Sequence, residues 1–392
     1  MKTKDMDEQY TFTKRVRNIL AIVALAGLLL SVASIFIFKP DSSRIWANVL
    51  LNNQLFLGIA LGGAFFLAAH RIAWSGWHTA LQRIPEALTS FLPVAFLLMA
   101  LIFFGMKDIY HWSHSDLHDP VLEAKSAWLN LPFFFIRMVL YFAGWIVLTQ
   151  GMKKQTDMLM DSGDIKFHNR RRIFAGLFLV FFAITVSTSS WDWIMSIDAH
   201  WYSTIFGWYV FIGMFVSSLA FMIVLIWFLK RAGYLAIIRV DHMHDLAKLL
   251  FAFSIFWTYL WFSQYLLIWY GHIPEETIYF VQRREDFELL FFLNLGLNFV
   301  IPFFGLMKLD FKRKLNWLAG VAGVVLVGHW IDYFQMIMPG AAGEHAGIGV
   351  LEITMTLFYA GLFLFVVLRA LASKPLLVKK DPFLEESLHY ES

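Results

Sequence analysis

The sequence predicts an all-α integral membrane protein with about ten transmembrane helices. Three observations lead to this prediction: 59% of the residues are hydrophobic, only 16% are charged, and long apolar runs follow one another along the chain. Soluble domains carry roughly 25% charged residues. The chain also has no cysteine, which excludes disulfides, cysteine-ligated iron–sulfur clusters and covalently attached c-type haem within it.

A helix needs about 20 mainly apolar residues to cross a bilayer. Ten runs approach this length, at 17–38, 49–73, 84–106, 129–150, 172–190, 203–229, 247–270, 287–308, 316–338 and 349–372. The first run is longer than the roughly 7–15 apolar residues of a signal peptide, so we expect a retained helix. The predicted organisation is an N-terminal tail at 1–16, a membrane domain at 17–372 and a C-terminal tail at 373–392.

The distribution of positive charge predicts the orientation of the chain. Most of the 32 Lys and Arg residues fall in the two tails and in the links that follow even-numbered helices. Cytoplasmic segments are enriched in these residues, so we expect both termini to be cytoplasmic. The same rule accounts for the basic links, and nucleic acid is not expected as a partner.

A weak internal repeat predicts how the helices are grouped. The segment "VSTSSWDWIMSID" aligns with "VLVGHWIDYFQMIMP", four helices later, and the alignment pairs Asp192 with Asp332. The segments "LIFFGMKDIYHWSH" and "LLIWYGHIPEE" show a second similarity at the same interval. We therefore expect two parallel four-helix bundles, helices 2–5 and 6–9, with two peripheral helices. Chance similarity between Trp-rich membrane exits is the alternative.

Ionisable residues inside the membrane are the candidates for function. Each costs about 2.5–3.5 kcal/mol at the bilayer centre and is therefore a functional-site hypothesis by default. At 1.5 Å per residue, seven such residues fall on the outer side, and we expect them to form one cluster of proton-transfer candidates: Arg137, Asp192, Asp198, His200, His329, Asp332 and Glu352.

Within this cluster, His329 and Asp332 are spaced i, i+3 and share a helix face. For Arg137, a structural tie to one acid is favoured over a functional role, and Asp198 and His200 also read as interfacial loop residues. His70 and Glu86 are further proton-transfer candidates on the cytoplasmic side, with interfacial anchoring as the alternative. No ionisable residue is expected at the midplane, so the sequence supports at most a half-channel open to one side.

Other chemistry has little support in the sequence. A membrane b-type haem needs two facing histidines, and His329 has no evident counterpart. The run "HWSHSDLH" places His111, His114 and His118 at helical spacing, but a solvated loop is favoured over a metal site. The run "VDHMHDLAK" is expected to be a surface loop that meets a partner or lipid headgroups.

Three segments resemble one known family. "STSSWDWIMSIDAHWYSTIFGWYVFIGMFVSS", "GHWIDYFQMIMP" and "GVLEITMTLFYAGLFLFVVLRAL" are similar to the ActF-type membrane subunit of bacterial alternative complex III. They resemble the NrfD-like membrane subunits of polysulfide reductases more distantly. The resemblance runs from the second helix to the tenth and is weakest in the outer loop 107–128.

The resemblance implies a cofactor-free subunit of a quinol:cytochrome c oxidoreductase in the bacterial cytoplasmic (inner) membrane. Quinol, haem c and iron–sulfur clusters would then be bound by partner subunits, and a terminal cytochrome oxidase and membrane lipids are further expected partners. Carried over by motif, Asp192, Asp198, His329 and Asp332 are the natural proton-path residues. Two alternatives remain open: a purely structural subunit that assembles the complex, and a stand-alone secondary transporter, which the nearly charge-free midplane disfavours.

Overall fold

The computed structural model describes residues 8–114 and 119–391, and these residues fold almost entirely into helices. In this part of the chain, ten helical segments are long and apolar enough to cross a membrane, which confirms the predicted fold class. They are α1 (Lys14–Phe38), α2 (Ser42–Ile72), the broken segment of α3 (Arg83–Leu88), α4 (Leu92–Leu101) and α5 (Met106–Ile109), α7 (Leu131–Ser162), α8 (Ile165–Trp193), α9 (Phe206–Arg231), α10 (Val240–Gly271), the pair α12 (Glu288–Leu295) and α13 (Ile301–Leu306), α15 (Leu315–Ala342) and α16 (Val350–Ala372).

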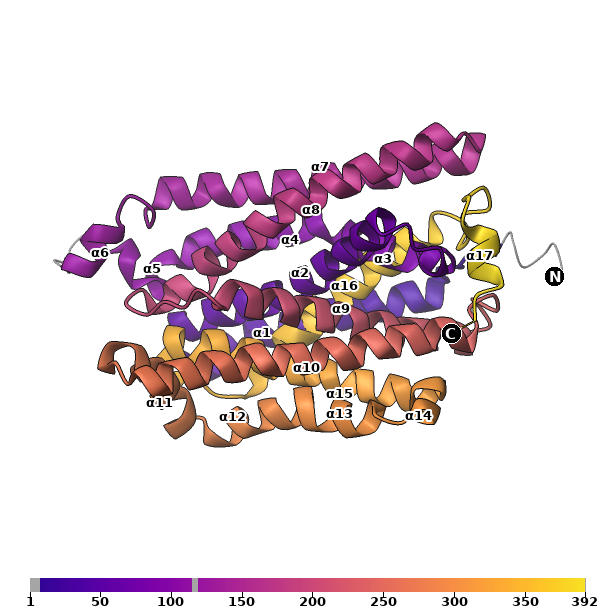
Figure 1. The fold of residues 1–392 in the computed structure, drawn as a ribbon. Coiled ribbons are helices and arrows are strands. Elements are labelled where there is room, and N and C mark those ends of the chain that lie inside the picture. The colour runs from indigo at the N-terminus through magenta and orange to yellow at the C-terminus, as the bar shows by residue number, and fades with distance from the viewer. Residues whose placement is uncertain (1–7, 115–118, 392) are drawn as a thin grey trace.

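The membrane helices pack as two groups of four. Helix α2, the α3–α5 segment, α7 and α8 contact one another in the first bundle, and α9, α10, α12–α13 and α15 do so in the second. The bundles meet through α2, which lies against both α9 and α15. Helices α1 and α16 pack along each other outside the bundles, and α16 also contacts α2 (Figure 1). This arrangement agrees with the grouping that the internal repeat predicts.

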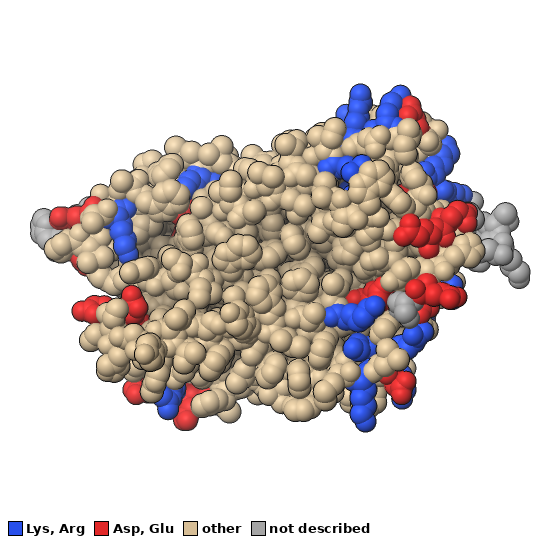
Figure 2. Space-filling view, viewed as in Figure 1, with Lys and Arg blue, Asp and Glu red and all other residues tan. Residues whose placement is uncertain are grey.

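The two ends of the molecule differ in charge. Both chain termini and the short helix α17 (Leu384–Leu388) lie at one end, which we call the terminal end. Helices α6 (Pro120–Lys125) and α11 (Pro274–Glu285) lie at the opposite end, the distal end (Figure 1). Figure 2 shows Lys and Arg gathered mainly at the terminal end, with a broad band free of charge between the ends.

The helices begin and end at residues with a local reason to do so. The side chain of Asn130 accepts a hydrogen bond from the Phe133 amide at 3.0 Å, and Pro132 occupies the first turn of α7. Helix α7 ends at Gly163, whose φ of 77° suits glycine far better than other residues. Asp164 then caps α8 by accepting from the Lys166 amide at 2.9 Å. The polar link predicted after residue 150 is therefore mostly helix, with a break of two residues.

Two other predicted polar segments also differ from the structure. The run "VDHMHDLAK" forms the first turns of α10 instead of a loop, and Asp241, His242, His244 and Asp245 are all buried. Residues after α16 fold back across the terminal end as an ordered segment. There the Leu376 amide donates to the Glu8 carbonyl at 2.8 Å. Packing against the bundle ends buries polar side chains that the sequence pattern alone places in water.

Candidate functional site

Asp192, at the distal end of α8, is held by a full set of donors. Arg137 of α7 forms a bidentate ion pair with it, in which Nε donates to Oδ2 at 2.7 Å and Nη2 donates to Oδ1 at 2.8 Å. The Trp128 indole donates to Oδ1 at 2.8 Å and the Tyr141 hydroxyl to Oδ2 at 3.0 Å. Asp192 is fully buried and Arg137 nearly so. A buried carboxylate paired in this way is neutralised and fixed in position.

Asp332, at the corresponding place on α15, is held by neutral donors. The Tyr209 hydroxyl of α9 donates to Oδ1 through a short hydrogen bond, and the Asn294 amide of α12 donates to the same oxygen at 2.9 Å. The Trp257 indole of α10 donates to Oδ2 at 3.1 Å. Within residues 8–114 and 119–391, no Lys or Arg forms an ion pair with Asp332, although its side chain is buried.

His329 is the ionisable neighbour of Asp332. Its Nδ1 lies 3.7 Å from Oδ2 of Asp332, as the i, i+3 spacing predicts. The ring is fully buried and packs edge-on against Trp257, and neither ring nitrogen has a hydrogen-bond partner in the described structure. Gly213 faces both side chains, because a Cβ built there would lie 3.7 Å from each. The imidazole and the carboxylate are thus buried neighbours without a hydrogen bond between them.

A small cavity lies beside two of the side chains that donate to Asp332, Tyr209 and Asn294. It has a volume of about 30 Å³ and is lined in part by Tyr209, Gln264, Asn294 and Gln335. A buried water needs roughly 10–15 Å³ and two to four polar partners. The Gln335 amide and Oε1 of Gln264 have no protein partner in the described residues. The cavity thus has the size and the polar groups needed to hold a water molecule beside Tyr209 and Asn294, two of the hydrogen-bond donors to Asp332.

Glu352 is held by a cation, like Asp192. Arg44 of α2 places Nε 2.8 Å from Oε1 and Nη2 2.9 Å from Oε2, and Asn48 donates to Oε1 at 2.9 Å. The amide of Gly349 donates to Oε2 at 2.8 Å, so the carboxylate also caps its own helix. The Glu352 side chain is fully buried, whereas the Arg44 side chain is 24% exposed.

The two remaining distal candidates lie in the connecting segments. Asp198 accepts from Nη2 of Arg283 at 3.0 Å, and Arg283 of α11 is itself buried over the Tyr279 ring. The side chain of His200 is largely exposed and contacts Asp119 at 2.5 Å. Asp198 is thus tied to helix α11, and His200 is tied to Asp119, the residue that caps α6.

The distal candidates do not form the single cluster that the sequence analysis expects. Arg137 pairs with Asp192 alone, while Glu352 and Asp198 have their own arginines, Arg44 and Arg283. The error arises because depth along a helix fixes only one coordinate, and the other two depend on how the helices pack.

At the terminal end, Glu86 is also neutralised by arginine. Arg71 donates to Oε1 at 2.7 Å and Arg83 to Oε2 at 2.8 Å, with all three residues buried. His70 bonds the Phe66 carbonyl at 2.8 Å, and its ring centroid lies 5.1 Å from that of His78. The clamp on Glu86 favours a structural role over proton transfer.

Sequence reasoning missed several members of these sites. Tyr209, Trp257 and Asn294 carry no charge, and their importance appears only when three helices converge on Asp332. In the outer loop, for which the sequence favours a solvated segment over a metal site, His114 contacts the Lys107 carbonyl at 2.8 Å, and His118 lies outside the described residues. No protein-family model and no curated protein matches this chain.

Proposed function

We propose that this chain is a cofactor-free membrane subunit of a quinol:cytochrome c oxidoreductase complex, in which Asp332 exchanges protons at the outer face. One observation carries the proposal: Asp332 is buried among neutral donors beside an imidazole, while Asp192 and Glu352 are neutralised by arginines. A buried carboxylate that no cation holds can take up a proton without leaving an unpaired buried cation, and neutral donors stabilise its ionised form.

Quinol oxidation near the outer surface releases two protons that need acceptors. Asp332 and His329 lie in the distal half of α15, and two donors to Asp332, Tyr209 and Asn294, line a cavity large enough for water. The concentration of basic residues at the terminal end supports placing that end in the cytoplasm, and hence Asp332 near the outer face. Redox centres would belong to partner subunits, and this chain would supply a half-channel for the released protons.

A second candidate function is a structural subunit that assembles the complex. The observation that favours it is the number of fully paired, buried ion pairs: Arg137–Asp192, Arg44–Glu352 and Arg71–Glu86 all fix one helix to another. Such pairs specify a single arrangement of helices without needing to change protonation. In this case Asp332 would add a further polar tie and nothing more.

The two functions are separated by one set of variants in the tagged, purified complex. Asp332→Asn keeps the size of the side chain but removes the exchangeable proton, and Glu352→Gln is the matched control at a neutralised site. We expect Asp332→Asn to lower quinol turnover or proton release in proteoliposomes by roughly 10²-fold, the low end for a lost acid–base group. Retention of the partner subunits, measured by mass spectrometry, checks assembly.

Full turnover and full proton yield in Asp332→Asn, with the subunits retained, would leave only the structural role. The wider assignment has its own test, because the tagged chain should co-purify with c-type haem and an iron–sulfur protein in mild detergent. A colourless chain that purifies alone would contradict the respiratory-complex proposal altogether.

A further inference from the structure

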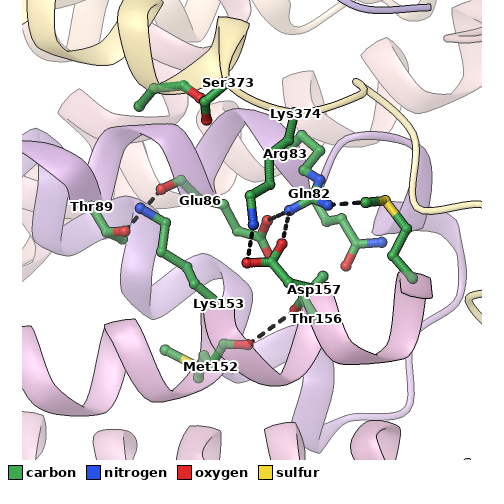
Figure 3. Close-up of polar contacts among 12 residues, drawn as sticks. Gln82, Arg83, Glu86, Thr89, Met152, Lys153, Thr156, Asp157, Ser373 and Lys374 are labelled. Atoms are coloured by element: carbon green, nitrogen blue, oxygen red, sulfur yellow. Dashed lines mark hydrogen bonds and ion pairs between the residues drawn. The ribbon is translucent and has the colours of Figure 1, made fainter. Parts of the chain in front are cut away.

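A polar cavity at the terminal end of the first bundle is separate from the aspartate sites. It has a volume of about 190 Å³ and opens between α3, α7 and the end of α16. Three cations line it, namely Arg83, Lys153 and Lys374, together with the carboxylates of Glu86 and Asp157. Figure 3 shows these side chains converging from the three segments.

The two carboxylates are already satisfied by other cations. Glu86 accepts from Arg71 and Arg83, and Asp157 pairs with Arg83 at 3.3 Å and with Lys374 through a shorter contact. The lining of the cavity therefore carries three cations and two carboxylates, an excess of one positive charge. Such an excess at a partly buried site is unfavourable unless an anion compensates it.

Lys153 is the cation that no carboxylate holds. Its ammonium donates to the Ser90 hydroxyl at 2.7 Å, and within the described residues no acid lies within 4 Å of it. In Figure 3 the Lys153 side chain extends away from Asp157, whereas Lys374 points toward it. Lys153 is half-buried, so water hydrates the ammonium incompletely. Lys153 therefore lies at the cavity without a direct ion pair, and Glu86 and Asp157 attract its ammonium only from a longer distance.

The cavity lies at the depth where lipid phosphates are found. Lys153 is roughly 33 Å along α7 from Leu131 at 1.5 Å per residue, and the hydrocarbon core is about 30 Å thick. Gln150 lines the cavity about one turn before Lys153, and the side chain of Val147, a further turn towards the bilayer, is 62% exposed. A ligand with a phosphate at the cavity and acyl chains in the adjacent bilayer fits this depth.

We infer that this cavity binds the phosphate of an anionic phospholipid, with Lys153 as the contact that selects negative charge. Basic pockets between transmembrane helices at the cytoplasmic side bind anionic headgroups in other membrane proteins. A lipid bound here would connect α3, α7 and α16, and so join the first bundle to a peripheral helix. Free phosphate has the same headgroup chemistry, and the experiment below separates the two sources.

The test uses the full chain in nanodiscs of phosphatidylcholine with or without phosphatidylglycerol. Native mass spectrometry then counts the lipid that stays bound. We expect Lys153→Met to weaken phosphatidylglycerol retention roughly five- to tenfold, as loss of one basic contact implies. Lys154→Met, at the exposed neighbouring position, is the matched control and should leave retention unchanged. Lys153→Arg, which keeps the charge, should preserve it.

A measurement on the unaltered chain avoids any effect of substitution on folding. Amine-reactive labelling of Lys153, read by peptide mass spectrometry with Lys154 as internal control, should be slowed by phosphatidylglycerol and not by phosphatidylcholine. Equal protection by both lipids, or equal retention in the two Met variants, would overturn the inference. Protection by inorganic phosphate alone, without protection by phosphatidylglycerol, would overturn the assignment to a lipid.

Discussion

Asn294 takes the place in the second bundle that Arg137 takes in the first. Each is the seventh residue of its helix, α12 or α7, and each donates through side-chain nitrogen to the buried aspartate of its own bundle. The aspartates also match, since Asp192 and Asp332 each accept from one tyrosine hydroxyl and one tryptophan indole. The donors come from different places, because Tyr141 and Trp128 lie on or just before α7, whereas Tyr209 and Trp257 belong to α9 and α10. The two sites thus share the types of donor, with an amide in the second bundle where the first has a guanidinium.

This exchange explains why one aspartate is a candidate for proton transfer and the other is not. A guanidinium with two parallel hydrogen bonds stabilises only the ionised carboxylate. An amide stabilises it far less, so that a proton can be added without leaving a buried cation unpaired. The repeat that the sequence indicates therefore holds for the helices and for the two aspartates, and the donors around each aspartate differ in kind and in origin.

Restoring the cation in the second bundle should abolish proton exchange there. In Asn294→Arg we expect the new guanidinium to pair with Asp332 and hold it ionised. Infrared difference spectroscopy during quinol oxidation would follow the protonated carboxyl band, which we expect to be absent both in this variant and in Asp332→Asn. Asn294→Gln keeps an amide and should retain the band. A band of unchanged intensity in Asn294→Arg would contradict the proposal that the neutral donors around Asp332 allow it to take up a proton.

Removing the acid of the first bundle should affect stability more than proton chemistry. Asp192→Asn leaves Arg137 buried without its charge partner, and breaking a buried pair in this way costs about 3–5 kcal/mol. We expect a marked fall in the thermal unfolding midpoint in detergent. The double variant Arg137→Leu/Asp192→Leu removes both charges and should be more stable than Asp192→Asn. A double variant as unstable as the sum of its parts would argue against the ion pair as the cause.

The sequence predicted the positions of the ten membrane helices and indicated the two aspartates as candidate site residues, because both inferences depend on short-range pattern. Runs of apolar residues fix the ten spans, and the i, i+3 rule places His329 beside Asp332. What the sequence did not predict is which arginine holds which acid. Arg44 and Glu352 are 308 positions apart, and only the packing of α16 against α2 brings them together.

The same limit applies to the terminal end. A polar C-terminal segment reads as a solvated tail, yet Ser387 is fully buried and its hydroxyl donates to the Trp77 carbonyl at 2.7 Å. Hydropathy describes how a segment would partition between water and lipid. It does not describe a segment that finds its hydrogen-bond partners on another part of the same protein.

Docking of the C-terminal segment should depend on pH through Asp381. Burial acts to raise the pKa of Asp381, but the charge of Arg171 and the hydrogen bonds from Arg171 and Gln82 outweigh it and hold the pKa at about 2. Because the pKa of Asp381 is lower in the docked state, its ionised carboxylate stabilises docking by about 2 kcal/mol at any pH above the ordinary pKa of about 3.9. This stabilisation is lost as the pH falls from about 4 towards 2.

The docking is measurable because the chain has no cysteine of its own. A spin label attached in Glu385→Cys, at an exposed position of α17, should become mobile as the pH falls from about 4 to about 2. In Asp381→Asn we expect a mobile label already at neutral pH. The exposed Glu391→Gln serves as the control and should follow the parent chain. A label in Asp381→Asn that is immobile at neutral pH would exclude this anchor.

The pairing of α1 with α16 should depend on two glycines. A Cβ at Gly27 would lie 2.4 Å from the Phe358 backbone nitrogen, and one at Gly361 would lie 2.7 Å from that of Ala24. Small residues allow membrane helices to approach this closely, and the resulting backbone contacts replace the hydrophobic driving force that lipid does not supply. Ser31 also donates to Thr354 across the interface at 2.9 Å. Helix α1 has few other buried residues, so it depends on this contact.

Gly27→Leu should therefore separate the two helices without unfolding the bundles. A disulfide between Ser31→Cys and Thr354→Cys reports the contact directly, and we expect its yield to fall sharply when Gly27→Leu is added. Gly320→Leu is the matched control, because nothing lies within 4 Å of a Cβ at that position of α15. An undiminished yield in the Gly27 variant would show that α1 is held by contacts other than close backbone approach. A loss of yield in both variants would point to general destabilisation instead of a local clash.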